Sequence, residues 1–312
     1  MKVLIAEYAV ATGMPGTYEV EGRAMLSTLA KSFERLGHEV VYPTAGPVIG
    51  AGEGFYINGE EDFEDLLEYL EATAGLVIAP DELLPGFLEL LEKGKTINLG
   101  CTPAAARLSA DKLACTRRLE EAGVPVVEIF DPDDPGDGPF VLKPRFGCAS
   151  ERMELVDELP ENLDDRIATK YHQGESLSVS LIASGDRVLP ITVNKQLVCV
   201  EAGFEYLGGI VPYHTDREEE ILRVAKAAAR ALDLSGYAGI DLVVGDLPRV
   251  VDVNPRPTTS IVGIAKVMRE ELADLILRAR FATLPEGVTV EGVCEFRKGE
   301  LELQGNGPSS GR

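Results

Sequence analysis

Histidine and cysteine are scarce in this chain of 312 residues, which has three histidines and five cysteines. The cysteines are scattered, odd in number and without a C-x-x-C pair. This pattern argues against a disulfide framework and against a zinc site built from thiolates and imidazoles. Unpaired cysteines of this kind are typical of a reducing compartment, so the sequence predicts a cytoplasmic protein.

Basic residues are also few. The chain has 30 Lys and Arg against 52 Asp and Glu, which gives a net charge of −22. Nucleic-acid binding needs clustered basic side chains and is not expected. No apolar run reaches the roughly 18 residues that suggest a membrane span. The apolar start, residues 1–6, is too short for a signal peptide and predicts a first strand. We therefore expect neither nucleic acid nor a membrane as partner.

A dinucleotide-binding glycine fingerprint is missing as well. The nearest run is GAGEG at residues 50–54, which has the wrong spacing and is followed by FYING instead of a helix. We expect a flexible loop there. The missing fingerprint disfavours a nicotinamide-dependent oxidoreductase, the alternative from another enzyme class.

Hydrophobic residues in the N-terminal third alternate between strand and helix patterns. Strands are expected at residues 2–6, 39–42, 75–79 and 96–99, and helices at 19–36, 63–70 and 87–91. Such alternation predicts an α/β fold with a doubly wound parallel sheet. The length and the 45% hydrophobic content allow two or three domains.

Further elements are expected downstream. A helix at 109–122 opens with Ser-Ala-Asp-Lys, and strands follow at 140–143, 167–171 and 176–183. Residues 215–218 (TDRE) have the spacing of a capping box and would open a helix that stops near Gly236. Another amphipathic helix is expected at 272–282, and the Gly/Ser/Pro-rich tail, 305–312, predicts disorder.

The most informative segment is a predicted β-hairpin, with strands at 238–244 and 249–254 around the turn GDLP. If Val244 pairs with Arg249, the same register pairs Asp241 with Asp252. Directly opposed side chains lie about 4.5–5.5 Å apart at Cβ, and like charges there repel. The hairpin thus predicts two carboxylates side by side on one face of a sheet.

Asn254 would point to the same face, two residues beyond Asp252. Two carboxylates and an amide oxygen suit Mg²⁺. The alternative is a solvated outer face of the hairpin, because Asp and Asn are common near turns. The constrained segment after the strand, PRPTTS at 255–260, favours the metal site. Its Arg256 would hold a planar donor fork near a bound phosphate.

Lys143 ends an apolar strand and is followed by the small-residue segment PRFGCAS at 144–150. A lysine that faces inward from a strand end needs an anionic partner. Phosphate is one such partner, because backbone N–H groups of the following loop can share it. The alternative is a surface lysine before a turn.

Together these segments resemble the ATP-grasp superfamily over about residues 100–270. The similar parts, in the order of the family, are SADK at 109–112, FVLKP at 140–144, GCAS at 147–150, TKYHQGE at 169–175, Asp241, and DVNPR at 252–256. The resemblance implies an ATP-grasp architecture behind an N-terminal domain. We expect domains at 1–105, 106–175 and 176–300, with a flexible tail at 301–312.

The resemblance also implies ATP and Mg²⁺, with Mn²⁺ as the alternative metal, and assigns roles to residues. The implied nucleotide contacts are Lys112, Lys143, Ser150, Thr169, Lys170, His172 and Glu175. Asp241, Asp252 and Asn254 would bind the metal. Arg256 would hold the transferred phosphoryl group or the acyl phosphate. Lys195 would be a second phosphate cation, or else a surface lysine. The segment 147–150 would form a lid.

The chain departs from the family pattern at three positions. Thr169 replaces the first acidic residue of the hinge, which matters little if the backbone contacts adenine. Ser176 falls where the ribose-binding acid is expected, so Glu175 is the nearest substitute. Asp252 stands on the metal strand where glutamate is commoner in the family.

Within the superfamily the chain resembles the archaeal amine–acid ligases that join tyramine to glutamate in methanofuran biosynthesis. The similar parts include EYA at 7–9, EGR at 21–23, NKQ at 194–196 and FEYLGG at 204–209. This implies an amide-forming reaction that releases ADP and phosphate. Glu7 and Glu21 would bind or deprotonate the amine, or else Glu21 would be an exposed helix residue. Gly208 and Gly209 would let substrate approach the backbone, or else form a plain turn.

Other functions stay open at this point. The chain could be another ATP-grasp amine–acid or amino-acid ligase, or a nucleotide-binding protein without turnover. The expected partners are a small carboxylate and a small amine, and a homodimer is compatible with the sequence.

Overall fold

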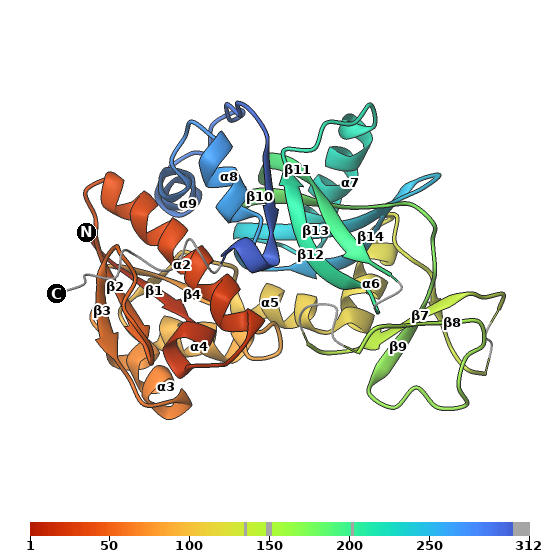
Figure 1. Ribbon diagram of the computed structural model, residues 1–312, viewed down its shortest axis with the longest axis horizontal. Coiled ribbons are helices and arrows are strands. Elements are labelled where there is room, and N and C mark those ends of the chain that lie inside the picture. Colours follow the sequence, from red (N-terminus) through yellow and green to blue (C-terminus); the bar gives the residue numbers. More distant parts are fainter. Residues whose placement is uncertain (134–135, 148–151, 201–202, 302–312) are drawn as a thin grey trace.

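The N-terminal part of the chain forms a parallel five-stranded sheet in the order β3-β2-β1-β4-β5 (Figure 1). The computed structural model describes residues 1–133, 136–147, 152–200 and 203–301. The strands are β1 (Lys2–Glu7), β2 (Glu39–Thr44), β3 (Glu53–Tyr56), β4 (Ala74–Ile78) and β5 (Ile97–Asn98). The helices are α1 (Tyr8–Thr12), α2 (Thr17–Arg35), α3 (Glu60–Tyr69) and α4 (Leu84–Lys93). The predicted α/β fold with a doubly wound sheet is confirmed.

A second sheet of six antiparallel strands has the order β14-β13-β10-β11-β12-β15. Its strands are β10 (Glu175–Ser184), β11 (Arg187–Cys199), β12 (Glu205–Val211), β13 (Gly236–Val244), β14 (Pro248–Asn254) and β15 (Cys294–Arg297). Its helices are α7 (Glu218–Ala231), α8 (Ile261–Val267) and α9 (Leu272–Phe281), and the 3₁₀ turn η1 (Lys298–Glu300) follows β15. β15 therefore returns to the far edge of this sheet, beside β12.

A third, smaller sheet lies at the other end of the molecule, in the order β6-β9-β7-β8 (Figure 1). It consists of β6 (Ile129–Phe130), β7 (Phe140–Pro144), β8 (Glu154–Val156) and β9 (Arg166–Lys170). Two helices, α5 (Pro103–Ala110) and α6 (Lys112–Glu121), lead from the first sheet toward it. The domain boundaries at 105, 175 and 300 stay a prediction.

Three local predictions were wrong. The expected flexible loop at 50–54 runs into an edge strand, because Glu53–Tyr56 pairs in parallel with β2. The single helix expected at 109–122 is two helices, because Asp111 is extended and its carboxylate caps α6 through the N–H groups of Leu113 and Ala114. The capping box at 215–218 does not form; α7 begins at Glu218 without a side-chain cap.

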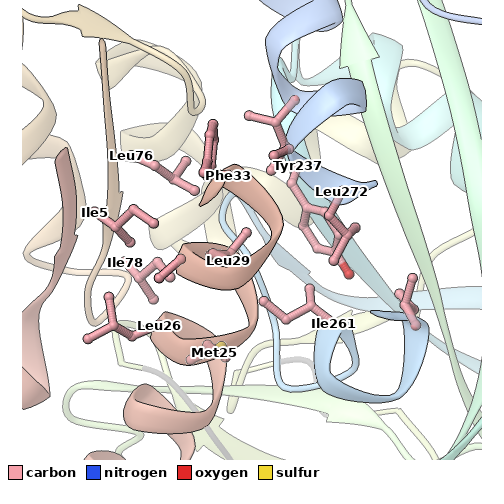
Figure 2. Packing of buried hydrophobic residues seen from close by; sticks show 14 of the residues in the cluster. Ile5, Met25, Leu26, Leu29, Phe33, Leu76, Ile78, Tyr237, Ile261 and Leu272 are labelled. Carbon is pink, nitrogen blue, oxygen red and sulfur yellow. The ribbon is translucent and has the colours of Figure 1, made fainter. Parts of the chain in front are cut away.

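Helix α2 joins the first sheet to the helices of the second. Figure 2 shows Leu29 and Phe33 of α2 between Ile5 and Leu76 on one side and Ile261 and Leu272 on the other. All are buried in one hydrophobic cluster. Because that cluster spans both sheets, they share a core.

The four-stranded sheet is attached differently. None of the described residues of β6–β9 belongs to the three hydrophobic clusters of the chain. Its hydrogen bonds to the second sheet are backbone bonds between residues 125–127, just before β6, and Val250, and a bond from Lys143 to the Val251 carbonyl. Val126 of the same segment also packs against the hydrophobic cluster of the second sheet. Separately, no helix in the described part of the chain is both long and apolar enough to cross a membrane.

The shared core gives a direct stability prediction. Phe33→Ala should lower the free energy of unfolding by about 3–5 kcal/mol, because Phe33 is fully buried where α2 contacts both halves. Urea unfolding followed by circular dichroism measures this. Phe281→Ala is the matched control, since Phe281 is 49% exposed at the end of α9, and should change stability by less than about 1 kcal/mol. Equal losses in both variants would contradict the packing described.

Candidate active site

The hairpin of β13 and β14 places Asp241 opposite Asp252, as the sequence predicted. The predicted register at the turn was wrong by one residue. Val244 pairs with Pro248, and Arg249 pairs with Val243. The register shifts between Leu242 and Asp241, where β14 contains one extra residue. A β-bulge therefore restores the pairing of the two carboxylates.

This bulge decides which way Asp252 points. Leu242 pairs with Val250, and both side chains are buried in the core behind the sheet. Side chains alternate between the two faces of a strand, so without the extra residue Asp252 would share the core face with Val250. Val251 is the residue without a ladder partner. Its insertion turns Asp252 to the same side as Asp241.

Two lysines from outside the hairpin compensate this pair of carboxylates. Lys112, at the start of α6, donates to both carboxylate oxygens of Asp252 at 2.8 Å. Lys143, at the end of β7, donates to the carbonyl of Val251 at 2.6 Å. Burial lowers the pKa of Lys143 to about 8, although Asp252 acts in the opposite direction. The predicted inward-facing lysine is thus buried at the site, and its neighbour is the bulge.

Asp241 accepts hydrogen bonds from two side-chain amides. Asn254 Nδ2 donates to it at 3.2 Å and Gln196 Nε2 at 3.0 Å. Burial, and next the charge of Asp252, raises the pKa of Asp241 to about 7. Burial also acts to raise the pKa of Asp252, but Lys112 and Lys143 outweigh it and hold that pKa below its ordinary value. The two carboxylates thus differ in how readily they ionise.

A row of polar residues continues from the hairpin across the sheet. Asp241 pairs with Ser178 on β10, and Ser178 pairs with Asn194 on β11. Asn194 is buried and donates to the hydroxyls of Ser178 and Ser180 at 3.2 and 3.0 Å. Because directly paired residues share a face, these side chains and Asp252 lie on one side of the sheet.

The first sheet contributes the opposite wall. Its strand order reverses between β1 and β4, and open α/β sheets bind ligands outside the carboxyl ends of strands at such a point. Glu7 ends β1 there and caps α1, its Oε2 accepting from Val10 N at 2.7 Å. Burial raises the pKa of Glu7 to about 8. Gly22 makes room for it, since a Cβ at that position would lie 2.4 Å from Glu7 Oε2.

Asp81 follows β4 at the same edge and reaches across to the second sheet. The side chain of Asp81 is only 2% exposed and accepts from Arg256 Nε at 2.9 Å. Arg256 lies in the segment directly after β14. An ion pair with a buried carboxylate limits the orientations of a guanidinium. Asp81 therefore fixes Arg256 and links the two sheets across the site.

Glu21 and Lys298 form a second ion pair nearby. Glu21, on α2, accepts from Thr259 Oγ1 at 2.6 Å. Its other oxygen lies 3.0 Å from Lys298 Nζ, which belongs to η1. The side chains of Lys298 and Glu21 are 25% and 21% exposed. This ion pair thus links the N-terminal part of the chain to its C-terminal part.

These groups surround one cavity of about 640 Å³. It is bounded by α1 and α2, the ends of β1 and β4, β7, and the polar face of the second sheet. The charged residues that line it are Glu7, Glu21, Glu82, Lys112, Lys143, Arg152, Asp241, Asp252, Arg256 and Lys298. A cavity of this size is sufficient for small-molecule ligands.

The predicted metal ligands come together in this cavity: Asp241, Asp252 and Asn254 all line it. No group of three His, Cys, Asp or Glu with metal-binding geometry occurs in the described ranges. That finding is compatible with Mg²⁺, which is usually bound through one or two carboxylates plus substrate phosphates and water. The repulsion between Asp241 and Asp252 favours a cation between them.

Among the predicted residues that lie outside the cavity are Lys195 and Glu175. Lys195 was expected to be a second phosphate cation and Glu175 a ribose contact. Instead Lys195 Nζ lies 2.7 Å from Glu175 Oε1, and both approach Tyr213. Lys195 pairs with the buried Leu177, on the face opposite Gln196. Ser176, not Glu175, lines the cavity.

The two predicted substrate glycines have another role. Gly208 and Gly209 lie in β12, neither in a turn nor at the cavity, and pair with Arg297 and Phe296 of β15. Gly208 has φ +143°, and a Cβ there would lie 2.2 Å from the Phe296 carbonyl oxygen. The close approach of β15 therefore explains the glycine at 208.

The remaining predicted nucleotide contacts are not among the lining residues. Thr169 is buried in β9, and Lys170 donates to the carbonyl of Asp137 at 3.1 Å. His172 Nε2 lies 2.5 Å from Glu128 Oε2. Ser150 and most of the predicted lid at 147–150 fall outside the described residues. Their assignment to the nucleotide stays a prediction.

The sequence analysis missed Asp81, Gln196 and Lys298. Asp81 could have been found, because it follows a predicted strand at the carboxyl edge of a parallel sheet. Gln196 belongs to the segment NKQ at 194–196, in which Lys195 was predicted as the residue that contacts phosphate. A polar run of this kind does not show which of its residues faces inward. No local signal marks Lys298, which reaches the site only through the pairing of β15 with β12.

The buried Glu7 predicts a dependence of stability on pH. Its pKa is about 8 in the folded chain against an ordinary value of 4.5, so between these pH values the folded state holds a proton that the unfolded state has lost. The contribution of neutral, buried Glu7 to the free energy of unfolding is fully present below pH 4.5 and is lost as the pH rises to 8. Relative to Glu7→Gln, the unfolding free energy of the wild type should fall by up to about 1.4 kcal/mol per pH unit in this window.

Denaturant unfolding at several pH values measures the difference. Glu61→Gln is the control, because Glu61 is exposed in the first turn of α3 and its replacement should give a curve parallel to the wild type. A Glu7→Gln curve that is also parallel to the wild type would show that Glu7 titrates normally.

The family model of the ATP-grasp domain matches residues 109–260. The tyramine–L-glutamate ligase of Methanocaldococcus fervens is 29% identical over 290 residues, which cover 88% of this chain and 93% of that protein. The crystal structure of a putative ATP-grasp superfamily protein from Archaeoglobus fulgidus is 28% identical, with a TM-score of 0.76 over 92% of this chain and 90% of that one.

A more distant structure, the L-amino acid ligase from Bacillus licheniformis, shares the fold. It is 16% identical, with a TM-score of 0.69 over 98% of this chain and 77% of that one. The matched domain contains Lys112, Lys143, Asp241, Asp252 and Arg256, which line the cavity. The chain belongs to the ATP-grasp superfamily and is similar along most of its length to a carboxylate–amine ligase.

Proposed function

We propose that this protein is an ADP-forming ligase that joins the γ-carboxylate of glutamate to the amine of tyramine. One observation carries the proposal. A single cavity brings the lysines and paired carboxylates of the matched ATP-grasp segment against the acidic end of the N-terminal sheet. ATP and two small substrates can meet there. The resemblance to a tyramine–L-glutamate ligase along nearly the whole chain supports the choice of substrates.

The residues of the matched segment serve the nucleotide. Lys143 and Lys112 neutralise phosphate oxygens that do not react, and Asp241, Asp252 and Asn254 hold Mg²⁺, with Mn²⁺ as the alternative. The metal, when bound, neutralises phosphate charge and helps align the γ-phosphoryl group. The glutamate carboxylate attacks the γ-phosphorus, which gives an acyl phosphate and ADP. Arg256, oriented by Asp81, binds the transferred phosphoryl group.

The N-terminal sheet and its helices serve the amine. Met14, Tyr18 and Met25 line the cavity together with Glu7 and provide an apolar wall for an aromatic ring. The amine must lose a proton before it attacks the acyl carbonyl and displaces phosphate. In its ionised form Glu7 accepts that proton more readily than an ordinary carboxylate, because burial raises its pKa to about 8. We assign the amine to this end of the cavity.

The proposal is tested by ADP release with defined substrate pairs. Glutamate with tyramine should give ADP, phosphate and a γ-glutamyl amide at a rate well above either substrate alone. Glutamate with lysine or with a simple amino acid should be at least about 10-fold slower, since these acceptors leave the apolar wall unfilled or bury a second charge beside it. Preference for the amino acid would assign the chain to another branch of amine–acid ligases. ADP release that needs no acceptor substrate would contradict ligase activity.

The metal assignment predicts the effect of Asp241→Asn. The variant keeps the size of the side chain but removes a ligand charge, so turnover should fall by about 10²-fold or more. The fold should be as stable as the wild type or more so above pH 7, because the raised pKa of Asp241 makes its charge costly there. Asp252→Asn is a poorer test, since it would break the buried ion pair with Lys112.

Steady-state ADP release at several Mg²⁺ concentrations and thermal unfolding give the two readouts. Asp246→Asn is the control: Asp246 lies in the turn of the same hairpin, with its side chain 72% exposed and paired with Arg249. It should keep normal turnover. Normal activity of Asp241→Asn at ordinary Mg²⁺ would remove Asp241 from the metal site.

A further inference from the structure

We propose that Glu21 and Lys298 form a subsite for the head group of an α-amino acid, in which Lys298 binds the α-carboxylate and Glu21 the α-ammonium group. This inference rests on the proposed function, because it assigns a place to the acid substrate. It goes beyond that function in giving Lys298, near the C-terminus, a part in substrate selection.

The spacing of the pair fits such a ligand. Lys298 Nζ and Glu21 Oε1 lie 3.0 Å apart, and both residues line the cavity. An α-amino acid carries its ammonium and carboxylate groups on one carbon, so its two charges are also adjacent. When the amino acid binds, each protein charge exchanges its present partner for the oppositely charged group of the ligand. No charge is left without a partner in the process.

The same pair discriminates against incomplete ligands. A substrate without the ammonium group leaves Glu21 with its hydrogen bond from Thr259 but without a cation. A substrate without the α-carboxylate leaves Lys298 without an anion. Uncompensated charges in this partly buried site are costly, so either analogue should bind less tightly than glutamate.

The position of the pair suits the acid substrate. Thr259, which contacts Glu21, lies three residues after Arg256 in the segment that follows β14. Glu21, Asp241 and the half-buried Tyr206 all line the cavity, and burial and then both carboxylates act to raise the pKa of Tyr206, so the pair lies near the proposed metal site. A head group held there leaves the distal carboxylate of glutamate free to reach Arg256 and the nucleotide. Glu7 remains for the amine.

A purely structural role for the ion pair is not needed to hold the C-terminal segment. Residues 294–297 are paired with β12 along the ladder, and the buried side chains of Phe296 and Leu301 anchor the chain on either side of Lys298. A partly exposed ion pair adds little stability to such an anchored segment. Glu21 and Lys298 also lie outside residues 109–260, so the flanking parts of the chain select the substrate for a shared nucleotide site.

The test compares three acids with each of three proteins in steady-state ADP release with tyramine. Glutarate lacks the α-ammonium group of glutamate, and 4-aminobutyrate lacks its α-carboxylate. Lys298→Met should raise the KM for glutamate by about 10- to 100-fold and abolish the preference for glutamate over 4-aminobutyrate, while the preference over glutarate stays. Glu21→Gln should also raise the KM for glutamate, but it should abolish the preference for glutamate over glutarate and keep the preference over 4-aminobutyrate. The KM for ATP should be unchanged in both.

Arg297→Met is the matched control, because Arg297 is the neighbour of Lys298 in sequence but pairs with Glu295 and does not line the cavity. It should behave like the wild type. The crossed pattern of preferences supports the subsite, since a general loss of structure would affect all three acids alike. Equal effects on all three acids, or none, would overturn it.

Failure of the proposed function gives a different result. If the wild type ignores glutamate but releases ADP with another α-amino acid, the proposed substrate is wrong, and the crossed pattern with that amino acid and its two analogues still decides the subsite. If the wild type accepts no α-amino acid, the subsite is overturned as well.

Discussion

The site depends on one electrostatic constraint: two carboxylates opposed on adjacent strands need positive charge from elsewhere in the chain. Asp241 and Asp252 repel each other, and the hairpin itself offers only amide donors to Asp241. The compensating cations come from α6 and β7, which carry Lys112 and Lys143. The constraint therefore draws the third sheet and its leading helices against the second sheet. It also leaves the hairpin ready to exchange a protein cation for a metal.

The N-terminal sheet meets this charged centre through elements that also build the core. Helix α2 packs between the two larger sheets, carries Glu21 into the cavity and, at Gly22, leaves room for the side chain of Glu7. Asp81 fixes Arg256 from the other strand of the switch point. The acidic wall is thus positioned by a helix of the shared hydrophobic core and by a buried ion pair. This arrangement agrees with the proposal that the first sheet binds the substrates and the second sheet binds the nucleotide.

The parallel sheet and the hairpin could be predicted from the sequence, because local residue patterns specify both. The alternation of strands and helices predicted the parallel sheet, and turn residues between apolar runs predicted the hairpin with its opposed carboxylates. The pairing was right although the register at the turn was wrong, because the bulge adds one residue just before Asp252. A bulge without a glycine or proline has no clear local signal. The ordered set of ATP-grasp segments supplied the family.

What could not be predicted depends on which face a side chain takes and on distant pairing. The polar run at 194–196 does not alternate with apolar residues, so Lys195 and Gln196 could not be told apart. Asp111 did carry a signal, since an acidic residue before Lys112 is a good helix cap, and the helix break there was overlooked. Lys298 lies on the last described turn and reaches the site only because β15 joins the edge of the second sheet.

The polar attachment of the four-stranded sheet has a mechanical consequence. Separation of this sheet from the second one would break hydrogen bonds that water can replace, and would expose little of the three apolar clusters. Separation of the first sheet from the second would instead open a continuous core. We therefore expect that any hinge motion occurs on the β7 side, which carries Lys143. In that case the acid and amine would bind to a preformed wall, and the nucleotide would enter and leave beside the four-stranded sheet.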